Sequence, residues 1–299
     1  MTIVIAGGSG YIGTQLSKKL LSLGHRVVVI DVHAPRFTHS ELFFIQCDIS
    51  AQALPYDVLE KTDAVINLAG RTIATRWTKK VMEEIRTSRI ESTKHIVETI
   101  KNTKNKPACF ICASAIGFYG DTSDVECDEK CSQGQGFLAD VVSEWETTAR
   151  EATEYGVRTV CVRTAPVLGH GGFLSELTKS ARFGFLVKLQ RKDFWMSWIH
   201  EDDIVGTYIF ALETTTVQGV FNAAAPEALP HSVFMKTLGK VISRRVMGAL
   251  PRFFAKKLFG SFFDEITKSQ RITPKRLLDK GFSFSYPTLK EALNAIYKK

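Results

Sequence analysis

The first 31 residues constrain the fold of this chain more than any other stretch. An apolar run over residues 2–6 leads into a glycine-rich turn, a segment over 14–23 carries leucines on one face, and a second apolar run over 27–30 ends at Asp31. A strand, a turn, a helix, a strand and a terminal acid in this order form a dinucleotide-binding unit. We therefore expect a nucleotide site at this turn.

Each glycine of the turn has its own physical task. Gly7 lets the chain leave the strand sharply, Gly10 lets a pyrophosphate approach the backbone, and Gly13 lets the helix pack closely on the sheet. Tyr11 and Ile12 lie in the turn just before the predicted helix, and the unpaired N–H groups and positive dipole end of a helix N-terminus favour an anion. All five are predicted cofactor-binding residues. The alternative is a glycine-rich turn in an α/β protein that binds no nucleotide.

The acid that closes the second apolar run bears on the choice of cofactor. Asp31 follows Gly13 at close to the expected offset of about 20 residues. Its carboxylate can accept hydrogen bonds from the adenine ribose and repels a 2′-phosphate, which favours NAD. Arg36 follows five residues later and keeps NADP open as the alternative.

Two later strand ends supply further candidate cofactor contacts. Asp48, after the run over 42–47, can accept from the adenine amino group, and the small residues after Asn67 let that turn approach adenine and ribose. Each turn could also be an ordinary strand end. The predicted cofactor contacts at these ends are Asp48, Ile49, Leu68, Ala69, Gly70 and Arg71.

Strands and helices alternate through the first half of the chain, which predicts βαβ units and a parallel sheet buried on both faces. The predicted strands are residues 2–6, 27–30, 42–47, 64–68, 108–114, 158–163 and 219–222, and the main predicted helices are 14–23, 80–101 and 139–155. The expected fold class is α/β, a Rossmann-type doubly wound parallel sheet with a small, discontinuous, mostly helical C-terminal lobe. Residues 1–170 plus about 200–225 would form the dinucleotide-binding domain, and about 171–199 plus 226–299 the substrate-binding lobe.

Composition excludes several other classes. The chain has 299 residues, 44% of them hydrophobic and 23% charged, and no apolar run approaches the roughly 20 residues that span a bilayer. The first strand begins at the N-terminus without a signal-like segment, so a cytoplasmic location is expected. The net charge of +8 is spread over helices, so we predict no nucleic-acid and no membrane partner.

The basic, aromatic stretch 244–259 is interpreted as an amphipathic helix with its aromatic face on the body of the protein, the alternatives being a membrane-surface helix or an adhesive basic patch.

Four cysteines have a spacing that resembles a zinc ribbon. They are Cys109, Cys112, Cys127 and Cys131. The first two lie in an apolar run that predicts a strand, where positions three apart point to opposite faces. One metal cannot easily take both, so we expect buried free thiols and no metal site.

Short sequence words along the whole chain carry a family resemblance. The chain resembles the atypical extended short-chain dehydrogenases/reductases, and within them the NAD-dependent epimerase/dehydratase-like subfamily called epimerase family protein (SulA-homologue-like). The resemblance implies a Rossmann domain with a small C-terminal substrate lobe. The words include Gly7–Gly13, Asn67–Gly70, Arg76-Trp77-Thr78, Ser114–Gly120, Phe137-Leu-Ala, Trp145-Glu146, Arg163-Thr164, Ser197–His200 and Ser269-Gln-Arg271.

The catalytic signature of that superfamily is missing. Its enzymes use a Tyr-x-x-x-Lys pair, in which the lysine and the nicotinamide lower the tyrosine pKa. Here the tyrosine position falls on Phe137 or its neighbour Leu138, and the lysine position on Val141 or Val142. The assisting serine lies at Ser114, or on Ala115 when the match is made on Tyr119. The candidate catalytic residues are therefore Ser114 and Tyr119.

Other polar residues leave alternatives open. Asp140 and Glu144 could act as acid and base, or form a solvated helix face. Arg86 and Arg89 could pair with phosphate or carboxylate groups of a ligand, or form surface ion pairs. His200 is interpreted as structural, with Asp202 or Asp203 capping the next helix.

These observations predict an NAD(P)-binding protein. The expected activity is that of an oxidoreductase or epimerase on an unidentified small polar substrate, by a mechanism without the tyrosine–lysine pair. The alternative is a dinucleotide-binding redox-sensing or interaction module without turnover. By resemblance, the chain could form a homodimer.

Overall fold

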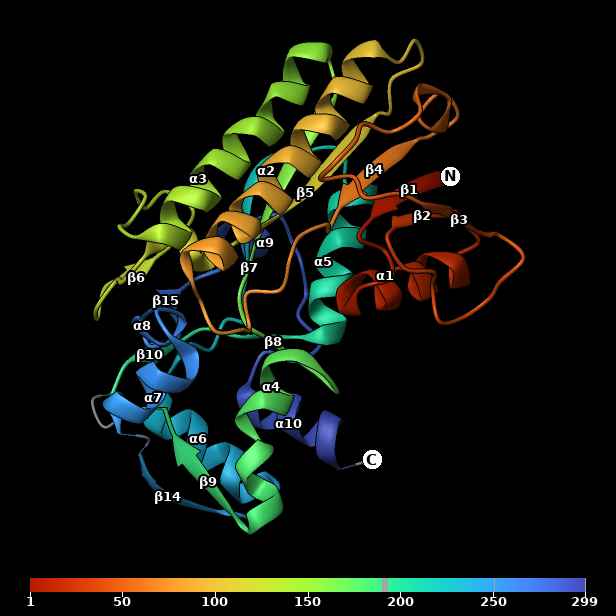
Figure 1. Cartoon of the computed structure of the whole chain (residues 1–299). Coiled ribbons are helices and arrows are strands. Elements are labelled where there is room, and N and C mark those ends of the chain that lie inside the picture. Colours follow the sequence, from red (N-terminus) through yellow and green to blue (C-terminus); the bar gives the residue numbers. More distant parts are fainter. Residues whose placement is uncertain (190–192, 250, 299) are drawn as a thin grey trace.

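A seven-stranded parallel sheet forms the centre of the molecule (Figure 1). This computed structural model describes residues 1–189, 193–249 and 251–298. The strand order is β12-β7-β5-β4-β1-β2-β3, so the chain runs outward from β1 in one direction and then crosses to the other side at β4. This confirms the predicted doubly wound sheet. The strands are β1 Thr2–Ala6, β2 Arg26–Asp31, β3 Leu42–Gln46, β4 Ala64–Asn67, β5 Cys109–Ala115, β7 Arg158–Thr164 and β12 Gly219–Ala223.

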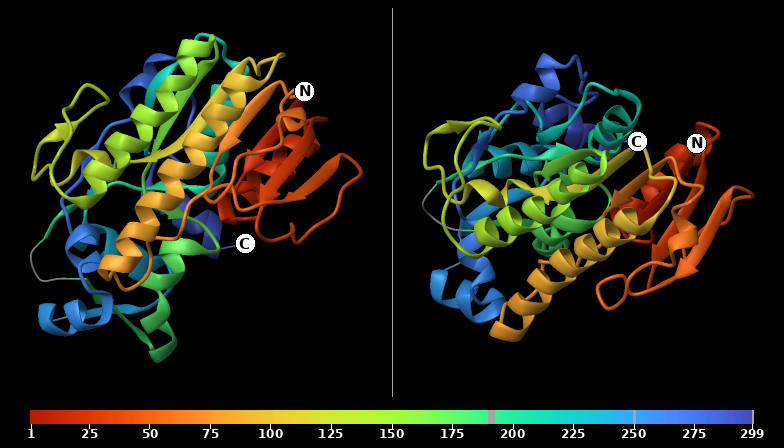
Figure 2. Two further views of the ribbon diagram at one scale, coloured as in Figure 1. Left: turned by 45° about the horizontal axis from the view of Figure 1, so that its top comes forward. Right: turned by 90° about the horizontal axis from the view of Figure 1, so that it is seen from above.

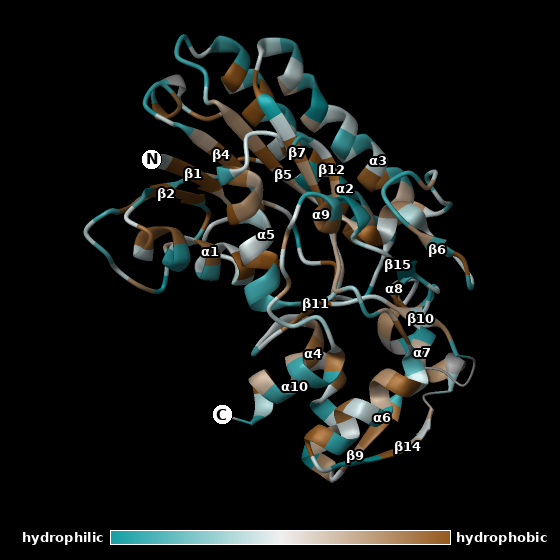
Figure 3. Cartoon of the chain, turned by 180° about the vertical axis from the view of Figure 1, so that it is seen from behind, coloured by the Kyte–Doolittle hydropathy of each residue, from teal (hydrophilic) through white to brown (hydrophobic). Residues whose placement is uncertain are grey.

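Helices cover both faces of this sheet. Helices α1 (Tyr11–Ser22) and α5 (Glu201–Glu213) contact each other on one face, and α2 (Lys79–Asn102) and α3 (Phe137–Arg150) lie side by side on the other (Figures 1 and 2). Successive strand residues point to opposite faces, so alternate members of each strand enter two separate cores. Both faces of the sheet are therefore buried, which explains why the strands are nearly continuous apolar runs and are brown in Figure 3.

The C-terminal lobe has a core of its own. Trp198 and Phe234 are buried there, and α6 packs against α10. The lobe is mostly helical, as predicted, with a small parallel pair, β9 and β14. Its elements are α4 Gly172–Leu177, β9 Phe185–Lys188, β10 Trp195–Met196, β13 Leu229–Pro230, α6 His231–Val241, β14 Arg245–Ala249, α7 Arg252–Phe259, α8 Phe262–Ile266 and α10 Leu289–Tyr297.

One part of the predicted lobe segment returns to the sheet domain. Ile272 and Leu277 are buried in the same core as α1 and α5, and the two-residue strand β15 (Arg271–Ile272) pairs with β6 (Glu126–Cys127). Helix α9 (Lys275–Asp279) contacts β12. The chain therefore returns to the sheet domain one extra time and then crosses back to the lobe for α10, which makes two more crossings than the sequence predicted. The remaining short strands, β8 Val167–Leu168 and β11 Ile199–His200, pair where the chain leaves the sheet domain and returns to it.

The basic, aromatic stretch 244–259 differs from its prediction. Its first part is strand β14, because the backbone there pairs with β9. In α7, Phe253 and Phe254 are 75% and 61% exposed, so the prediction that this aromatic face packs on the body is wrong for these two rings. Phe259 does pack inward. Leu250 lies outside the described residues.

The cysteine prediction is confirmed for the strand pair. Cys109 and Cys112 are buried on opposite faces of β5, in separate cores. Within the described ranges all six cysteines are free, and no group of three or more His, Cys, Asp or Glu side chains could hold a metal. None of the helices in the described part of the chain has the length and apolarity needed to cross a membrane.

Candidate functional site

The glycine turn between β1 and α1 is held by close backbone packing. Gly7 has φ +75°, and a Cβ there would lie 2.7 Å from the backbone of Leu68 and Ala69. A Cβ on Gly13 would lie 2.5 Å from the carbonyl oxygen of Gly7. Both positions therefore require glycine. Gly7 makes the predicted sharp turn off β1, whereas the close contact of Gly13 is with the backbone of the glycine turn, so its predicted role in packing the helix on the sheet stays a prediction.

The N-terminus of α1 is open toward the outside of the turn. Gly10 is the N-cap and offers no side-chain cap, and the first turn contains no acid. Among the described residues, none accepts from the backbone N–H of Tyr11, Ile12 or Gly13. A Cβ on Gly10 would meet only the Gly7 carbonyl oxygen within 4 Å. The turn thus presents free N–H groups at a positive dipole end, with room for a phosphate to approach.

Asp31 ends β2 beside this turn. One carboxylate oxygen accepts from the backbone N–H of Ser9 at 3.1 Å, and the other from His33 at 3.2 Å. These bonds orient the carboxylate, and each oxygen keeps a lone pair for a ribose hydroxyl. Arg36, the residue that kept NADP open, is exposed on the following loop.

Asp48 and Ile49 follow β3 on the same edge of the sheet. The Asp48 carboxylate is exposed and accepts from the backbone N–H and the hydroxyl of Ser50, at 3.0 and 2.7 Å. Ile49 is buried, and its carbonyl oxygen lies 2.7 Å from Nδ1 of His95. The Asp48 carboxylate is therefore oriented and accessible to a ligand.

The turn after β4 forms the opposite wall. Asn67 is buried, donates to Thr93 Oγ1 at 2.9 Å and accepts from the backbone N–H of Ala69 at 3.0 Å. Thr93 Oγ1 also accepts from the indole of Trp145 at 2.8 Å. This buried network fixes the backbone of Leu68, Ala69 and Gly70 against the glycine turn.

The two arginines of α2 have different surroundings. Arg86 is paired with Glu144 on α3 at 2.7 Å, with both side chains partly exposed, so for it the surface ion-pair alternative holds. Arg89 has no carboxylate partner among the described residues. Its Nη1 donates to the carbonyl oxygens of Arg71 and Ile85, both at 3.0 Å, and burial lowers its pKa to about 10.

Arg89 lies next to the turn Leu68–Gly70 that follows β4. A Cβ on Gly70 would lie 3.3 Å from its side chain, and its guanidinium lies 5.4 Å from the ring of Trp145. Burying a cation without a counter-ion is costly. An anionic group bound at this turn would relieve that cost. Arg71 itself is turned outward and pairs with Glu84.

Tyr11 joins the glycine turn to the entrance of the lobe. Its hydroxyl donates to the Glu201 carboxylate at the start of α5 and accepts from the backbone N–H of Gly171 at 3.2 Å. Burial, reinforced by the carboxylate, raises the pKa of Tyr11, so the hydroxyl stays protonated. Glu201 was not predicted, and no local pattern marks it, because Tyr11 lies 190 residues away in sequence.

Both candidate catalytic residues belong to a buried polar network. Ser114 donates to Glu146 Oε1 at 2.6 Å, and Arg163 binds both oxygens of Glu146, at 2.7 and 2.8 Å. Arg163 also donates to the Tyr119 hydroxyl, which donates to Asn222 Oδ1 at 2.8 Å. None of these five side chains is more than 4% exposed. The hydroxyls of Ser114 and Tyr119 are thus occupied within the protein, and their catalytic roles stay predictions.

Charge within this network is balanced by pairing. Burial raises the pKa of Tyr119 to about 12, although the nearby Arg163 opposes the shift. Burial alone would lower the pKa of Arg163, but its bonds to Glu146 outweigh that effect and the pKa is raised. The Arg163 guanidinium also stacks on Phe118, 3.4 Å from the ring centroid. The sequence signal that could have revealed this network is Arg163 itself, a charged residue inside a run of buried strand residues.

An aromatic cluster occupies the start of α3, where the superfamily tyrosine is missing. Phe137 packs edge-on against Trp77, with ring centroids 5.2 Å apart, and the ring centroids of Trp77 and Phe262 of the lobe are 5.4 Å apart. Val141 and Val142 are buried. The absence of the tyrosine–lysine pair thus coincides with an apolar contact between helix and lobe.

The remaining polar candidates have structural partners. Glu144 pairs with Arg86, and Asp140 accepts from Gln133 at 3.1 Å, so they do not act together. His200 is buried and caps α5 itself, with Nδ1 accepting from the Asp202 backbone N–H at 3.1 Å. The prediction that an aspartate caps this helix is therefore wrong. Asp203 instead accepts from the backbone N–H groups of residues 285 and 286.

Comparisons with known proteins agree with this architecture. The profile of the NAD dependent epimerase/dehydratase family matches residues 3–224, and a domain of unknown function, DUF1731, matches residues 250–296. Epimerase family protein YfhF of Bacillus subtilis is 32% identical over 299 residues, covering 99% of this chain and 98% of that protein. Human epimerase family protein SDR39U1, crystallised with NADPH, superposes with a TM-score of 0.87 at 28% identity, covering both chains completely.

A more distant structure shares the fold alone. UDP-glucuronic acid 4-epimerase from Bacillus cereus, solved with UDP-glucuronic acid and NAD, has a TM-score of 0.81 at 21% identity and covers 100% of this chain and 98% of its own. The family profile spans most of the chain, and the Bacillus subtilis relative spans nearly all of it. The chain therefore belongs to the NAD-dependent epimerase/dehydratase family, among the epimerase family proteins.

Proposed function

We propose that this chain binds a nicotinamide dinucleotide and acts as an oxidoreductase or epimerase on a small polar substrate. The observation that carries the proposal is the open N-terminus of α1. Near this turn, Asp31 at the end of β2 carries an oriented carboxylate, and Arg89 on α2, beside Gly70, has no carboxylate partner among the described residues. Free N–H groups, a carboxylate and a guanidinium are the groups that a pyrophosphate and a ribose require.

The residues fit the cofactor in distinct roles. The backbone N–H groups of Tyr11, Ile12 and Gly13 would hold the pyrophosphate, Asp31 would accept from the adenine ribose, and Arg89 would neutralise phosphate charge. Bound there, the nicotinamide supplies hydride transfer. The NADPH in the human relative supports this class of cofactor. The preference for NAD over NADP that Asp31 predicts stays a prediction.

The substrate chemistry must proceed without the usual tyrosine. Phe137 and Val141 carry no exchangeable proton, and the hydroxyls of Ser114 and Tyr119 are buried and bonded. The start of α3 instead makes an aromatic contact with the lobe through Trp77. We therefore assign no proton transfer to α3 and propose that this helix has a packing role beside the cofactor.

The same facts favour a second candidate, a dinucleotide-binding module without turnover. The specific observation is that an apolar cluster replaces the catalytic pair. Both candidates need the cofactor site, so cofactor binding alone does not separate them. Consumption of NADH or NADPH does.

The test has two stages. Purified protein is first titrated with NADH and with NADPH by nicotinamide fluorescence, and we expect micromolar or tighter binding of at least one. Binding of neither contradicts both candidates. The protein is then screened with both reduced cofactors against small polar carbonyl compounds. Turnover above that of an Arg89→Gln control supports the enzyme, whereas binding without turnover across the panel supports the module.

A further inference from the structure

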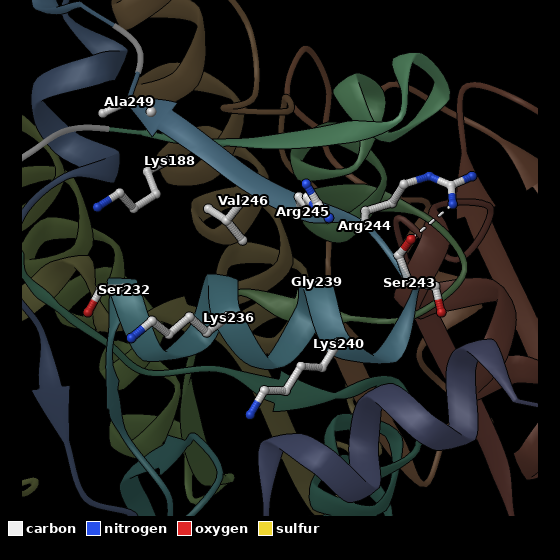
Figure 4. A pocket seen from close by; sticks show the side chains of 11 residues that line it. Lys188, Ser232, Lys236, Gly239, Lys240, Ser243, Arg244, Arg245, Val246 and Ala249 are labelled. Carbon is white, nitrogen blue, oxygen red and sulfur yellow. Dashed lines mark hydrogen bonds between the residues drawn. The ribbon is translucent and has the colours of Figure 1, made fainter.

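A basic hollow opens on the C-terminal lobe, away from the glycine turn. It has a volume of about 1100 Å³ and lies between α6, β14 and the end of β9 (Figure 4). The charged side chains that line it are Lys188, Lys236, Lys240, Arg244 and Arg245. No residue of the cofactor site described above lines it.

On one side of the hollow, α6 and the turn before β14 are in direct backbone contact. A Cβ on Gly239 of α6 would lie 2.6 Å from the carbonyl oxygen of Arg244, so the helix and the turn before β14 touch directly. Ser243 in that turn has φ +55°, in the left-handed region. The Arg244 Nε donates to the Ala181 carbonyl oxygen at 3.0 Å, which anchors the turn to the neighbouring segment. The hollow therefore has a built wall rather than a loose loop as its boundary.

Four of the cations around the hollow form no ion pair with a described residue. Among the residues that the structure describes, no carboxylate lines the hollow or pairs with Lys188, Lys236, Lys240 or Arg245. Lys236 and Lys240 are one turn apart and leave α6 on the same side (Figure 4), which places like charges next to each other. Lys188 stands opposite the Ala249 end of β14. Positive charge is thus gathered from three elements. One carboxylate, that of Asp193, lies at the margin, where it accepts from the backbone N–H and the hydroxyl of the lining residue Ser232 at 2.9 and 2.5 Å.

The lobe as a whole also carries an excess of positive charge. Residues 171–199 and 226–299 contain 20 Lys and Arg against 7 Asp and Glu, whereas the rest of the chain contains 19 against 24. The net charge of +8 therefore comes entirely from the lobe, and the sheet domain is net acidic. Such an asymmetry draws anions to the lobe and raises their local concentration there.

The lining narrows the chemistry of the ligand. Among the described lining residues, the apolar side chains are Val246 and Ala249. The hydroxyls belong to Ser232, which donates to Asp193, and to Ser243. A flat bilayer cannot reach the floor of a concave site. We propose that the hollow binds a small anion that carries two or more phosphate groups, contacted by Lys188, Lys236, Lys240 and Arg245. This proposal does not depend on the cofactor site.

The test uses the full-length protein and inorganic tripolyphosphate as the probe. Binding is measured by calorimetry, and hydrogen exchange locates the protected residues. The lining variant combines Lys188→Gln, Lys236→Gln and Arg245→Gln. The control combines Lys280→Gln, Lys290→Gln and Lys298→Gln, three exposed lysines near the C-terminus that lie outside the hollow, with the same total charge change. The thermal midpoint of each variant shows that it is folded.

We expect protection within residues 232–249, affinity at least about tenfold weaker in the lining variant, and affinity within about twofold of wild type in the control. Equal weakening in both variants would mean a nonspecific charge effect and would overturn the proposal. No binding by wild type at about 1 mM, or protection confined to residues 7–13, would overturn it too. So would a single-stranded oligonucleotide of about 12 nucleotides that binds more tightly and protects residues well beyond the hollow, since this indicates a nucleic-acid surface.

Discussion

Replacing Glu146 by glutamine tests whether the buried network stabilises the fold through charge pairing. The substitution keeps the shape of the side chain but leaves Arg163 as a buried cation without a counter-ion, because Arg163 contacts both Glu146 oxygens in a side chain that is 1% exposed. Breaking such a pair from one side costs about 3–5 kcal/mol. With an unfolding entropy of about 2.1 cal/mol/K per residue over 299 residues, the thermal midpoint should fall by about 5–8 °C.

The matched control lies on the same helix. Glu144→Gln removes a glutamate that is also paired with an arginine, Arg86, but in a pair that is partly exposed. We expect a loss of less than about 1 kcal/mol, or under about 2 °C. The assay is urea unfolding followed by far-UV circular dichroism, with calorimetry for the midpoint. Equal losses in Glu146→Gln and Glu144→Gln would refute the reasoning, because burial would then make no difference.

Four further predictions follow from the same structure. Arg89→Gln should weaken NADH or NADPH binding at least about tenfold in fluorescence titrations. Arg86→Gln, which removes a surface-paired arginine of the same helix, should leave the affinity within about twofold of wild type. Equal effects of the two variants would contradict the role of Arg89. Asp31→Ser should shift the ratio of NADPH to NADH affinity toward NADPH by about tenfold, and an unchanged ratio would mean that Asp31 does not contact the ribose. Gly13→Ala should abolish cofactor binding and lower stability by about 1–3 kcal/mol, because its Cβ would meet the Gly7 carbonyl oxygen at 2.5 Å; binding at wild-type affinity would show that the turn can relax. Burial lowers the pKa of His231 to about 4, so as the pH falls the unfolded chain takes up a proton before the folded chain does, and up to about 3 kcal/mol of stability is lost between pH 6.5 and 4. His231→Phe should flatten this part of the pH–stability curve, measured by urea unfolding. An unaltered slope would assign the effect to other groups.

Features that depend on neighbouring residues were predictable from the sequence. The strand, glycine turn and helix at the N-terminus lie where the spacing of Gly7 and Gly13 predicts, because turn chemistry and helix packing act over a few residues. The opposite orientation of Cys109 and Cys112 follows from the two-residue period of a strand in the same way.

Features that depend on distant partners were not predictable. Ser114 and Glu146 are 32 residues apart, and Tyr119 and Asn222 are 103 apart, so no local pattern reports their bonds. The same holds for strand β14. It was expected to be part of one helix over 244–259, but its backbone pairs with β9 about 60 residues earlier, a contact that no local pattern reports.

The position of Tyr11 has a consequence for how the two ends of the site communicate. This side chain follows directly on the free N–H groups of α1, and its hydroxyl reaches Gly171 and Glu201, where the chain enters and leaves the lobe. A ligand that shifts the lobe relative to the sheet domain would therefore also displace Tyr11 and the glycine turn. Thermodynamic linkage is reciprocal, so a substrate that tightens the binding of a cofactor by a given factor is itself bound more tightly by the same factor when that cofactor is present.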